Sequence, residues 1–366
     1  MIGGPSTKMP RSLSSFLHNC VNKQQLIHFL LSEWSKASYG KRLLGRSVFF
    51  VCEDKCIQIQ SADGLSVSAT EVDELCSNHE EADTRIILHC MYAVKHQNVD
   101  REQCIVVKSP DTDVFVLLLA YQHLLCNLHT DVLFETGTGD KHRFLSVRKH
   151  AAILGNVTQA LPGLHAFTGC DSTSAFVHKG KKRPLSIMRR RGDFVKAFSD
   201  LGTDASRVDD SLLSVLQEFV CSMYSSYNVS DVNKVRSTLF RARYSIGLPQ
   251  SMLSPRTSGI DLSLLPPCRS SLVKHVLRAN YQTYVWKHAD HATIDIPSPV
   301  GCGWTTDDAN LLHVDWTDGD IIPNEVVDVL ADSTCISGDS EDVEEDDVVD
   351  NILDYVFDDD DDEDNF

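Results

Sequence analysis

The sequence predicts a mixed α/β fold, with a mostly parallel sheet flanked by helices, then a helical region and a disordered acidic tail. Two apolar segments, Cys104–Val107 and Asp131–Thr136, have the short β-branched and aromatic runs of buried strands. The segment Val114–Leu125 between them predicts a helix. A strand, a helix and a strand in this order indicate a parallel pair joined by a right-handed crossover.

The N-terminal part of the chain predicts a helix followed by a small hairpin. Apolar residues at helical spacing place the helix at Lys23–Trp34. Aromatic and β-branched residues predict a strand at Ser47–Val51, and Ile57–Ile59 is expected to pair with it before the turn Ala62–Gly64. A further helix is expected to start after Asn78 as N-cap, with acidic residues in its first turn.

After Gly139 the pattern becomes mostly helical. The expected helices are Val147–Leu154, Val157–Phe167, Leu185–Asp200, Asp210–Tyr224, Asp231–Tyr244 and Arg269–His288. We therefore divide the chain into an N-terminal helical segment (1–45), an α/β core with a basic segment (46–200), a helical region (201–332) and a disordered acidic tail (333–366).

The charge of the chain is concentrated in this tail. The net charge is −18, but Thr334–Phe366 contains 16 acidic residues and no basic one, which leaves 34 basic against 36 acidic residues elsewhere. Such a segment lacks the apolar content to offset its ordering entropy, and a basic protein is a possible partner for it.

Composition also predicts the compartment. No apolar run reaches the roughly 18 residues of a membrane-spanning helix, so we expect no membrane association. The segment Met1–Ser15 lacks the apolar core of a secretory signal, and the twelve cysteines show no repeated spacing. These features favour reduced thiols in a nuclear or cytoplasmic protein.

Three acidic clusters are candidates for chemistry: Glu80–Asp83 at a helix start, Asp111–Asp113 after a buried strand, and Asp171 after a Gly-Cys turn. Sites in open α/β sheets form beyond the carboxyl ends of the strands. Carboxylates gathered there repel one another unless a cation neutralises them, and Mg²⁺ prefers oxygen ligands. Each cluster alone has a local explanation, as a complement to the helix dipole or as turn residues.

The motifs HEEADTRI, SPDTDVFVL and TGCDSTSAFVHKGK resemble the central region of flap endonucleases and PIN-like nucleases. They also resemble a group of animal proteins derived from mobile elements. The resemblance covers Ser77–Lys182. It implies a PIN/FEN-like core and hydrolysis of phosphodiester bonds in DNA or RNA with two Mg²⁺ or Mn²⁺ ions. The implied metal ligands, which are also the implied catalytic residues, are Glu81, Asp83, Asp111, Asp113 and Asp171.

Two departures from the family pattern support an alternative. The family has a further metal-binding Asp in an apolar-Asp-Gly context before the first motif, whereas Asp63-Gly64 follows Gln60–Ala62, which is no buried strand. The Gly-Lys segment Lys179–Lys181 also lies closer to Asp171 than in the family. The alternative is a catalytically inactive nuclease-fold protein that serves as a nucleic-acid-binding or interaction scaffold.

A second alternative is a phosphatase of the haloacid-dehalogenase type, because that family also has Asp-x-Asp after a strand. Its first Asp follows the strand directly, whereas Ser109-Pro110 intervenes here. This difference disfavours the phosphatase.

A basic segment follows the third motif and predicts a nucleic-acid contact. Its cations are Lys179, Lys181, Lys182, Arg183, Arg189, Arg190 and Arg191. Contacts with phosphate dominate nucleic-acid affinity, so cations beside an acidic site suit a phosphodiester substrate. A nuclear-localisation signal or a solvated helix face explains the same segment.

Overall fold

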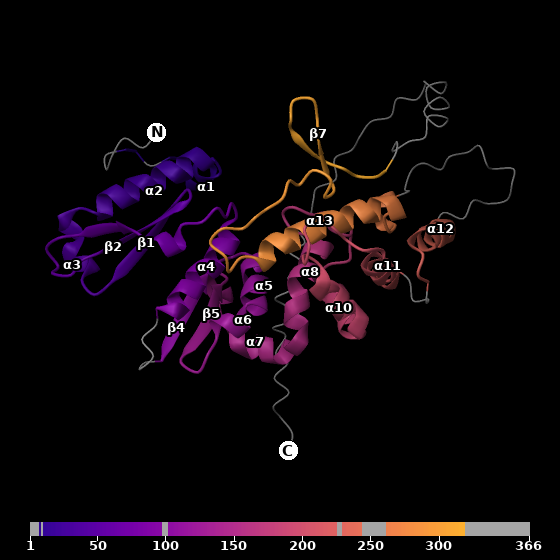
Figure 1. Cartoon of the computed structure of the whole chain (residues 1–366), viewed down its shortest axis with the longest axis horizontal. Helices are drawn as coiled ribbons and strands as arrows, with labels where there is room; N and C mark the ends of the chain where they lie inside the picture. The colour runs from indigo at the N-terminus through magenta and orange to yellow at the C-terminus, as the bar shows by residue number, and fades with distance from the viewer. Residues whose placement is uncertain (1–6, 9, 97–101, 225–228, 244–260, 319–366) are drawn as a thin grey trace, which may run out of the picture. The chain divides into compact units, whose positions relative to one another are not determined.

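The computed structural model describes residues 7–8, 10–96, 102–224, 229–243 and 261–318 (Figure 1). They form two compact units. The first holds the described residues of Met1–Asn98 together with Ala289–Ile294, and the second holds those of Val99–His288 and Asp295–Phe366. The division at Asn98 falls inside the range 46–200 that we expected as one core, and we describe each unit separately.

The first unit is a three-stranded antiparallel sheet with helices. Its elements are α1 (Leu13–Leu17), α2 (Cys20–Trp34), α3 (Gly40–Leu43), β1 (Ser47–Cys52), β2 (Lys55–Gln60), β3 (Ser68–Glu71) and α4 (Ala82–Lys95). The predicted hairpin is confirmed: β1 pairs with β2 antiparallel, and β3 adds to the other edge of β2. The helix expected at Lys23–Trp34 is α2, which packs against β1.

The core of the first unit lies between β2, the turn after β3 and α4. The buried side chains Cys56, Leu75 and Leu88 pack together, and Phe49 and Tyr92 cover them with ring centroids 5.7 Å apart. Burial raises the pKa of the Cys56 thiol to about 11, so it remains a neutral core residue.

The second unit combines a small sheet with most of the helices of the described residues. It starts with β4 (Gln103–Lys108), α5 (Thr112–Ala120), α6 (Gln122–Leu125), β5 (Thr130–Thr136), β6 (Arg143–Ser146), α7 (Val147–Leu154) and α8 (Leu161–Thr168). It continues with α9 (Lys182–Arg189), α10 (Gly192–Asp200), α11 (Asp210–Tyr224), α12 (Val232–Arg243), α13 (Arg269–Lys287), β7 (Trp304–Thr306) and β8 (Leu312–Val314).

The sheet of the second unit contains the predicted β–α–β succession. Strand β4 pairs with β5 in parallel, with α5 and α6 between them in sequence, and Phe115 of α5 packs on Phe134 of β5 at 5.0 Å between ring centroids. Strand β6, which we did not predict, pairs antiparallel with β5. Because only the turn through Gly137 (φ +77°) separates β5 from β6, no crossover helix fits there.

The mixed α/β class is therefore found, but the mostly parallel sheet is not confirmed. Among the strand pairings of the described residues, β4–β5 is parallel and the other four are antiparallel. None of the helices in the described part of the chain is both long enough and apolar enough to span a bilayer.

Helix α8 is the centre of the second unit (Figure 1). Its Phe167 packs at ring-centroid distances of 5.4 Å from Phe198 of α10, 6.1 Å from Phe219 of α11 and 5.2 Å from His275 of α13. The helices α11 and α13, which we expected in a separate region from residue 201, thus pack on α8 and belong to the same compact unit as the sheet.

Several predicted boundaries need correction. The helix expected at Leu185–Asp200 is broken into α9 and α10 because Arg191 adopts an extended conformation as the N-cap of α10. The helix expected at Val114–Leu125 is divided at Tyr121. Tyr244 and the tail 333–366 lie outside the described residues.

Candidate functional site

The loop after β4 places two carboxylates at the start of α5. Asp111 is the N-cap residue, and its Oδ1 accepts a hydrogen bond from the backbone N–H of Asp113 at 3.0 Å. Asp113 lies in the first turn, where the helix dipole favours negative charge. Asp111 and Asp113 offer carboxylate oxygens within 4.8 Å of each other. Asp111 therefore has a local role as a helix cap, where we had considered a role as a turn residue, and both carboxylates lie beyond the carboxyl end of a parallel strand.

The pKa of Asp111 is raised above its usual value, first by burial and then by the negative charges of Asp113 and Asp171. The backbone N–H of Asp113 and the nearby His165 oppose this shift. Neighbouring negative charges that raise the pKa of Asp111 are an electrostatic condition that a bound cation would relieve.

Asp171 is presented by a tightly folded loop at the end of α8. Gly169 has φ +115°, and a Cβ there would lie 2.8 Å from Ala175, so only glycine fits. Cys170 and Thr173 exchange backbone hydrogen bonds of 3.2 and 3.1 Å, and Ser172 Oγ donates to Gln282 of α13 at 2.7 Å. These contacts hold the loop in place, and the side chain of Asp171 is exposed at its tip.

Two further residues support the site: His165 comes from α8, and Lys181 is the N-cap residue of α9. His165 is 3% exposed, and its Nε2 lies 2.7 Å from Oδ1 of Asp113. Lys181 Nζ donates to the backbone oxygen of His165 at 2.9 Å, to Thr168 Oγ1 at 3.0 Å and to the Gly169 carbonyl oxygen. Its three ammonium hydrogens are thus used at the C-terminal end of α8, and we leave Lys181 out of the proposed phosphate contacts.

The sequence contained a signal that could have placed His165 near the acidic site. It lies in HAFTGCD, four residues before Gly169, so one helical turn separates it from the loop that carries Asp171. The spacing alone does not show that it faces Asp113, because α5 lies some fifty residues earlier in the chain.

The first motif belongs to the other unit. Glu81 is the N-cap residue of α4 and Asp83 lies in its first turn. Asn78, the expected N-cap, instead binds the backbone of Ile294, with its Nδ2 donating at 2.8 Å and its Oδ1 accepting at 2.9 Å. Arg85 donates from Nε to the His79 carbonyl oxygen at 2.7 Å, from Nη2 to that of Ser77 at 3.4 Å and from Nη1 to that of Glu53.

The basic segment forms an amphipathic helix. Pro184, Leu185 and Met188 of α9 are buried. The exposed cations are Lys182, Arg183, Arg189 and Arg190. Lys179 lies over the ring of Tyr224 at 4.0 Å, and Arg191 pairs with Asp193 and with Glu218. Cations in the first turn of a helix oppose its dipole, so Lys182 and Arg183 are not there to stabilise α9.

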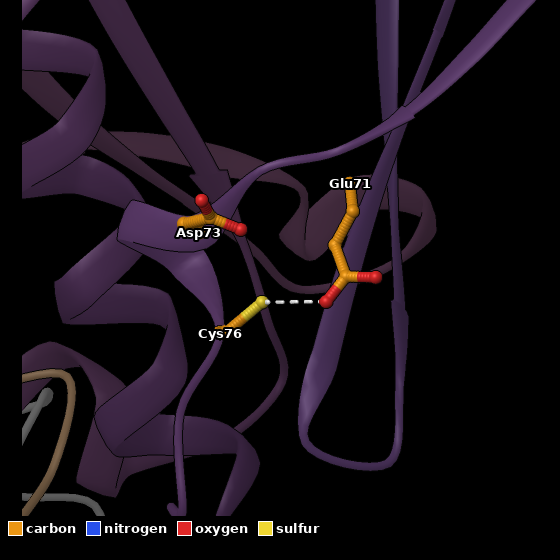
Figure 2. Close-up of side chains that lie close together, drawn as sticks. All are labelled: Glu71, Asp73 and Cys76. Atoms are coloured by element: carbon orange, nitrogen blue, oxygen red, sulfur yellow. Dashed lines mark hydrogen bonds between the residues drawn. The ribbon is translucent and has the colours of Figure 1, made fainter.

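A second group of possible metal ligands lies in the first unit and was missed by our sequence analysis. Glu71, Asp73 and Cys76 have ligand atoms within 4.8 Å of one another and could hold a metal ion (Figure 2). The Cys76 thiol donates to Glu71 Oε1 at 3.6 Å, and Lys55 Nζ lies 3.0 Å from Glu71 Oε2. Because Lys55 already supplies a positive charge to Glu71, the group is weaker than the α5 pair as a candidate.

Comparison with known proteins adds no assignment: no family model, no curated protein and no solved structure matches this chain.

Proposed function

We propose that this chain is a divalent-metal-dependent nuclease that hydrolyses phosphodiester bonds of DNA or RNA on a PIN/FEN-like core. The observation that carries the proposal is the arrangement of Asp111 and Asp113 beyond the parallel strand β4, with Asp171 close enough for its charge to raise the pKa of Asp111. These three residues belong to the ligand set that the family resemblance implied, and they lie in one unit.

The donor set suits Mg²⁺ or Mn²⁺. All donors are carboxylate oxygens, which hard divalent cations prefer. The Asp113 N–H uses Oδ1 of Asp111, and His165 uses Oδ1 of Asp113, so Oδ2 of each carboxylate is the oxygen left for a cation. A bound ion would stabilise charge on the phosphoryl oxygens and activate water.

The chain supplies substrate binding through α9. Its exposed arginines Arg183, Arg189 and Arg190 project from a helix whose other face is buried, and a guanidinium binds phosphate in a bidentate manner. We propose that these three residues and Lys182 hold the nucleic-acid backbone. Asp111, Asp113 and Asp171 would then hold the metal and carry the catalytic role.

The family resemblance extends the ligand set to Glu81 and Asp83 in the first unit. We propose that Glu81 and Asp83 contribute to the same function. Substitutions at these two residues test this part of the proposal independently of the Asp111 and Asp171 variants. If Asp83→Asn or Glu81→Gln reduces metal binding as strongly as Asp111→Asn does, they belong to the ligand set.

One series of variants tests both metal binding and cleavage. Without metal, Asp111→Asn removes a repelling charge at nearly constant volume, so its melting temperature should equal or exceed that of the wild type. With Mn²⁺ at a hundred times its dissociation constant, the wild type should gain about 2.7 kcal/mol of stability, and the mutant should lose most of this gain. Asp308→Asn, on an exposed turn, is the control and should keep the whole shift.

Cleavage of labelled flap, hairpin and single-stranded substrates with Mg²⁺ or Mn²⁺ then tests the activity. Loss of cleavage in Asp111→Asn and Asp171→Asn, with cleavage kept in Asp308→Asn, would support the nuclease. The absence of any metal-dependent shift in the wild type at millimolar Mn²⁺ would contradict it.

One observation favours the inactive scaffold as a second candidate. Asp63, the only Asp-Gly aspartate before the first motif, accepts hydrogen bonds from the backbone N–H groups of Leu65 and Ser66 at 2.8 and 2.9 Å. These bonds lower the pKa of Asp63 to about 2 and use its carboxylate in a surface turn. Binding of nucleic acid that depends on α9, without cleavage, would identify the scaffold.

A further inference from the structure

His165 combines deep burial with a bond to a proposed metal ligand. Its side chain is 4% exposed and that of Asp113 is 15% exposed, and Nε2 and Oδ1 are 2.7 Å apart. The residue comes from α8, whereas Asp113 comes from α5, and these two helices pack against each other. The orientation of the carboxylate therefore depends on a tertiary contact.

The hydrogen of this bond belongs to Nε2. An ionised carboxylate only accepts hydrogen bonds, so Nε2 must be the protonated nitrogen. The other ring nitrogen, Nδ1, is buried and has no hydrogen-bond partner among the described residues.

An unpartnered buried nitrogen is unfavourable for folding. Leaving such a group unsatisfied costs about 1–3 kcal/mol, and an apolar side chain of similar size would avoid this cost. A histidine kept here for packing alone has no physical advantage over leucine. Besides its ring contact with Trp286, at 5.9 Å between centroids, what distinguishes it from an apolar side chain is the Nε2–H that it directs at Asp113.

His275 of α13 provides an internal comparison. It is 6% exposed, and its Nε2 also makes a 2.7 Å hydrogen bond, but the acceptor is the backbone carbonyl oxygen of Phe167. Burial lowers the pKa of His275 to about 4. The two histidines share burial and bond length, and they differ in whether the acceptor is a main-chain group or a proposed ligand.

We propose that His165 is a positioning residue of the metal centre: its Nε2–H holds Oδ1 of Asp113 so that Oδ2 serves as the metal ligand. The inference rests on the proposed function. Groups that orient metal ligands in this way typically contribute about 10–100-fold to metal affinity. A merely structural histidine would change stability and leave metal affinity unaltered.

Two amide variants of the full-length chain test the proposal. His165→Gln carries its N–H₂ near the place of Nε2 and can still reach Asp113. His165→Asn carries the same group near the place of Nδ1 and cannot. The dissociation constant for Mn²⁺ is measured by titration, with free Mn²⁺ followed by electron paramagnetic resonance. The melting temperature without metal is measured in parallel.

We expect His165→Asn to bind Mn²⁺ about 10–100-fold more weakly than the wild type, and His165→Gln to recover most of the affinity. His275→Gln should lower the melting temperature without metal and keep the wild-type dissociation constant. Equal Mn²⁺ affinity in the wild type and both His165 variants would overturn the positioning role while leaving the metal centre intact. Absence of Mn²⁺ binding in the wild type would instead overturn the proposed function and this inference with it.

If His165→Asn does not fold, the Mn²⁺ affinity of His165→Gln is compared with that of Asp113→Asn instead. A Gln variant that folds and binds Mn²⁺ as weakly as Asp113→Asn would overturn the claim that the donor at the Nε2 position is what matters.

Discussion

The two motif regions use similar residues in different ways. In the first unit, His79 lies 2.6 Å from the backbone oxygen of His291, and Arg85 binds three backbone carbonyl oxygens. In the second unit, His165 binds the carboxylate of Asp113, and Lys181 holds the C-terminal end of the same helix. A histidine and a cation beside acidic residues therefore do not by themselves define a site. The two histidines differ in their acceptors, which are a main-chain oxygen for His79 and a carboxylate of the candidate site for His165.

The largest effect that tests this comparison of the two motif regions is expected from a substitution at Arg85. Replacing it with alanine leaves three carbonyl oxygens without their charged donor, and we expect the first unit to lose about 3 kcal/mol of stability. Hydrogen exchange of β1, β2 and α4 measures this loss. Arg183→Ala, at an exposed position of α9, should change stability by no more than about 0.5 kcal/mol. A wild-type exchange rate in Arg85→Ala would show that the motif is not structural.

A smaller loss is expected at Lys181. Lys181→Met removes the donor that joins His165, Thr168 and Gly169, and we expect a cost of about 2 kcal/mol together with faster amide exchange in Gly169–Thr173. Lys149→Met, at an exposed position of α7, is the matched control. If Lys181→Met keeps its stability but weakens nucleic-acid binding, Lys181 contacts phosphate as the sequence first suggested.

We expect substitutions of the basic residues around α9 to weaken nucleic-acid binding, and substitutions of lysines in the first unit to leave it nearly unchanged. Replacing Arg183, Arg189 and Arg190 by Gln should weaken binding to all sequences alike and reduce the salt slope by about 0.7–0.9 for each lost contact. The same change at the exposed Lys23, Lys36 and Lys41 matches the charge and should leave the slope nearly unchanged. An unaltered slope combined with loss of nuclear import would assign α9 to targeting.

The smallest effect is expected from the acidic tail. We expect its 16 acidic residues to compete with nucleic acid for the basic segment. Deletion of Thr334–Phe366 should then tighten binding a few-fold at low salt and have little effect at high salt. Fluorescence anisotropy at several ionic strengths measures the difference. The melting temperature should remain nearly unchanged, and a large decrease would show that the tail packs on the rest of the chain.

Local patterns in the sequence predicted the elements with regular periodicity. The helix Val147–Leu154 and the helix Asp210–Tyr224 have the predicted bounds, and the strands β4 and β5 differ from prediction by one residue at one or both ends. Hydrophobic spacing determines such elements because each needs one apolar face. The short strands β3 and β6 were missed because they have four residues each, with too few apolar positions to show a period.

By itself, the sequence determined where the acidic residues and the cations lie along the chain. It also indicated that a strand, a helix and a strand surround the Asp111–Asp113 pair. Only the tertiary structure decided that His165 faces Asp113, that Lys181 is used inside the fold, and that Arg85 binds carbonyl oxygens. Periodicity specifies which side of an element is apolar, whereas these contacts join residues on different elements and depend on how the elements pack.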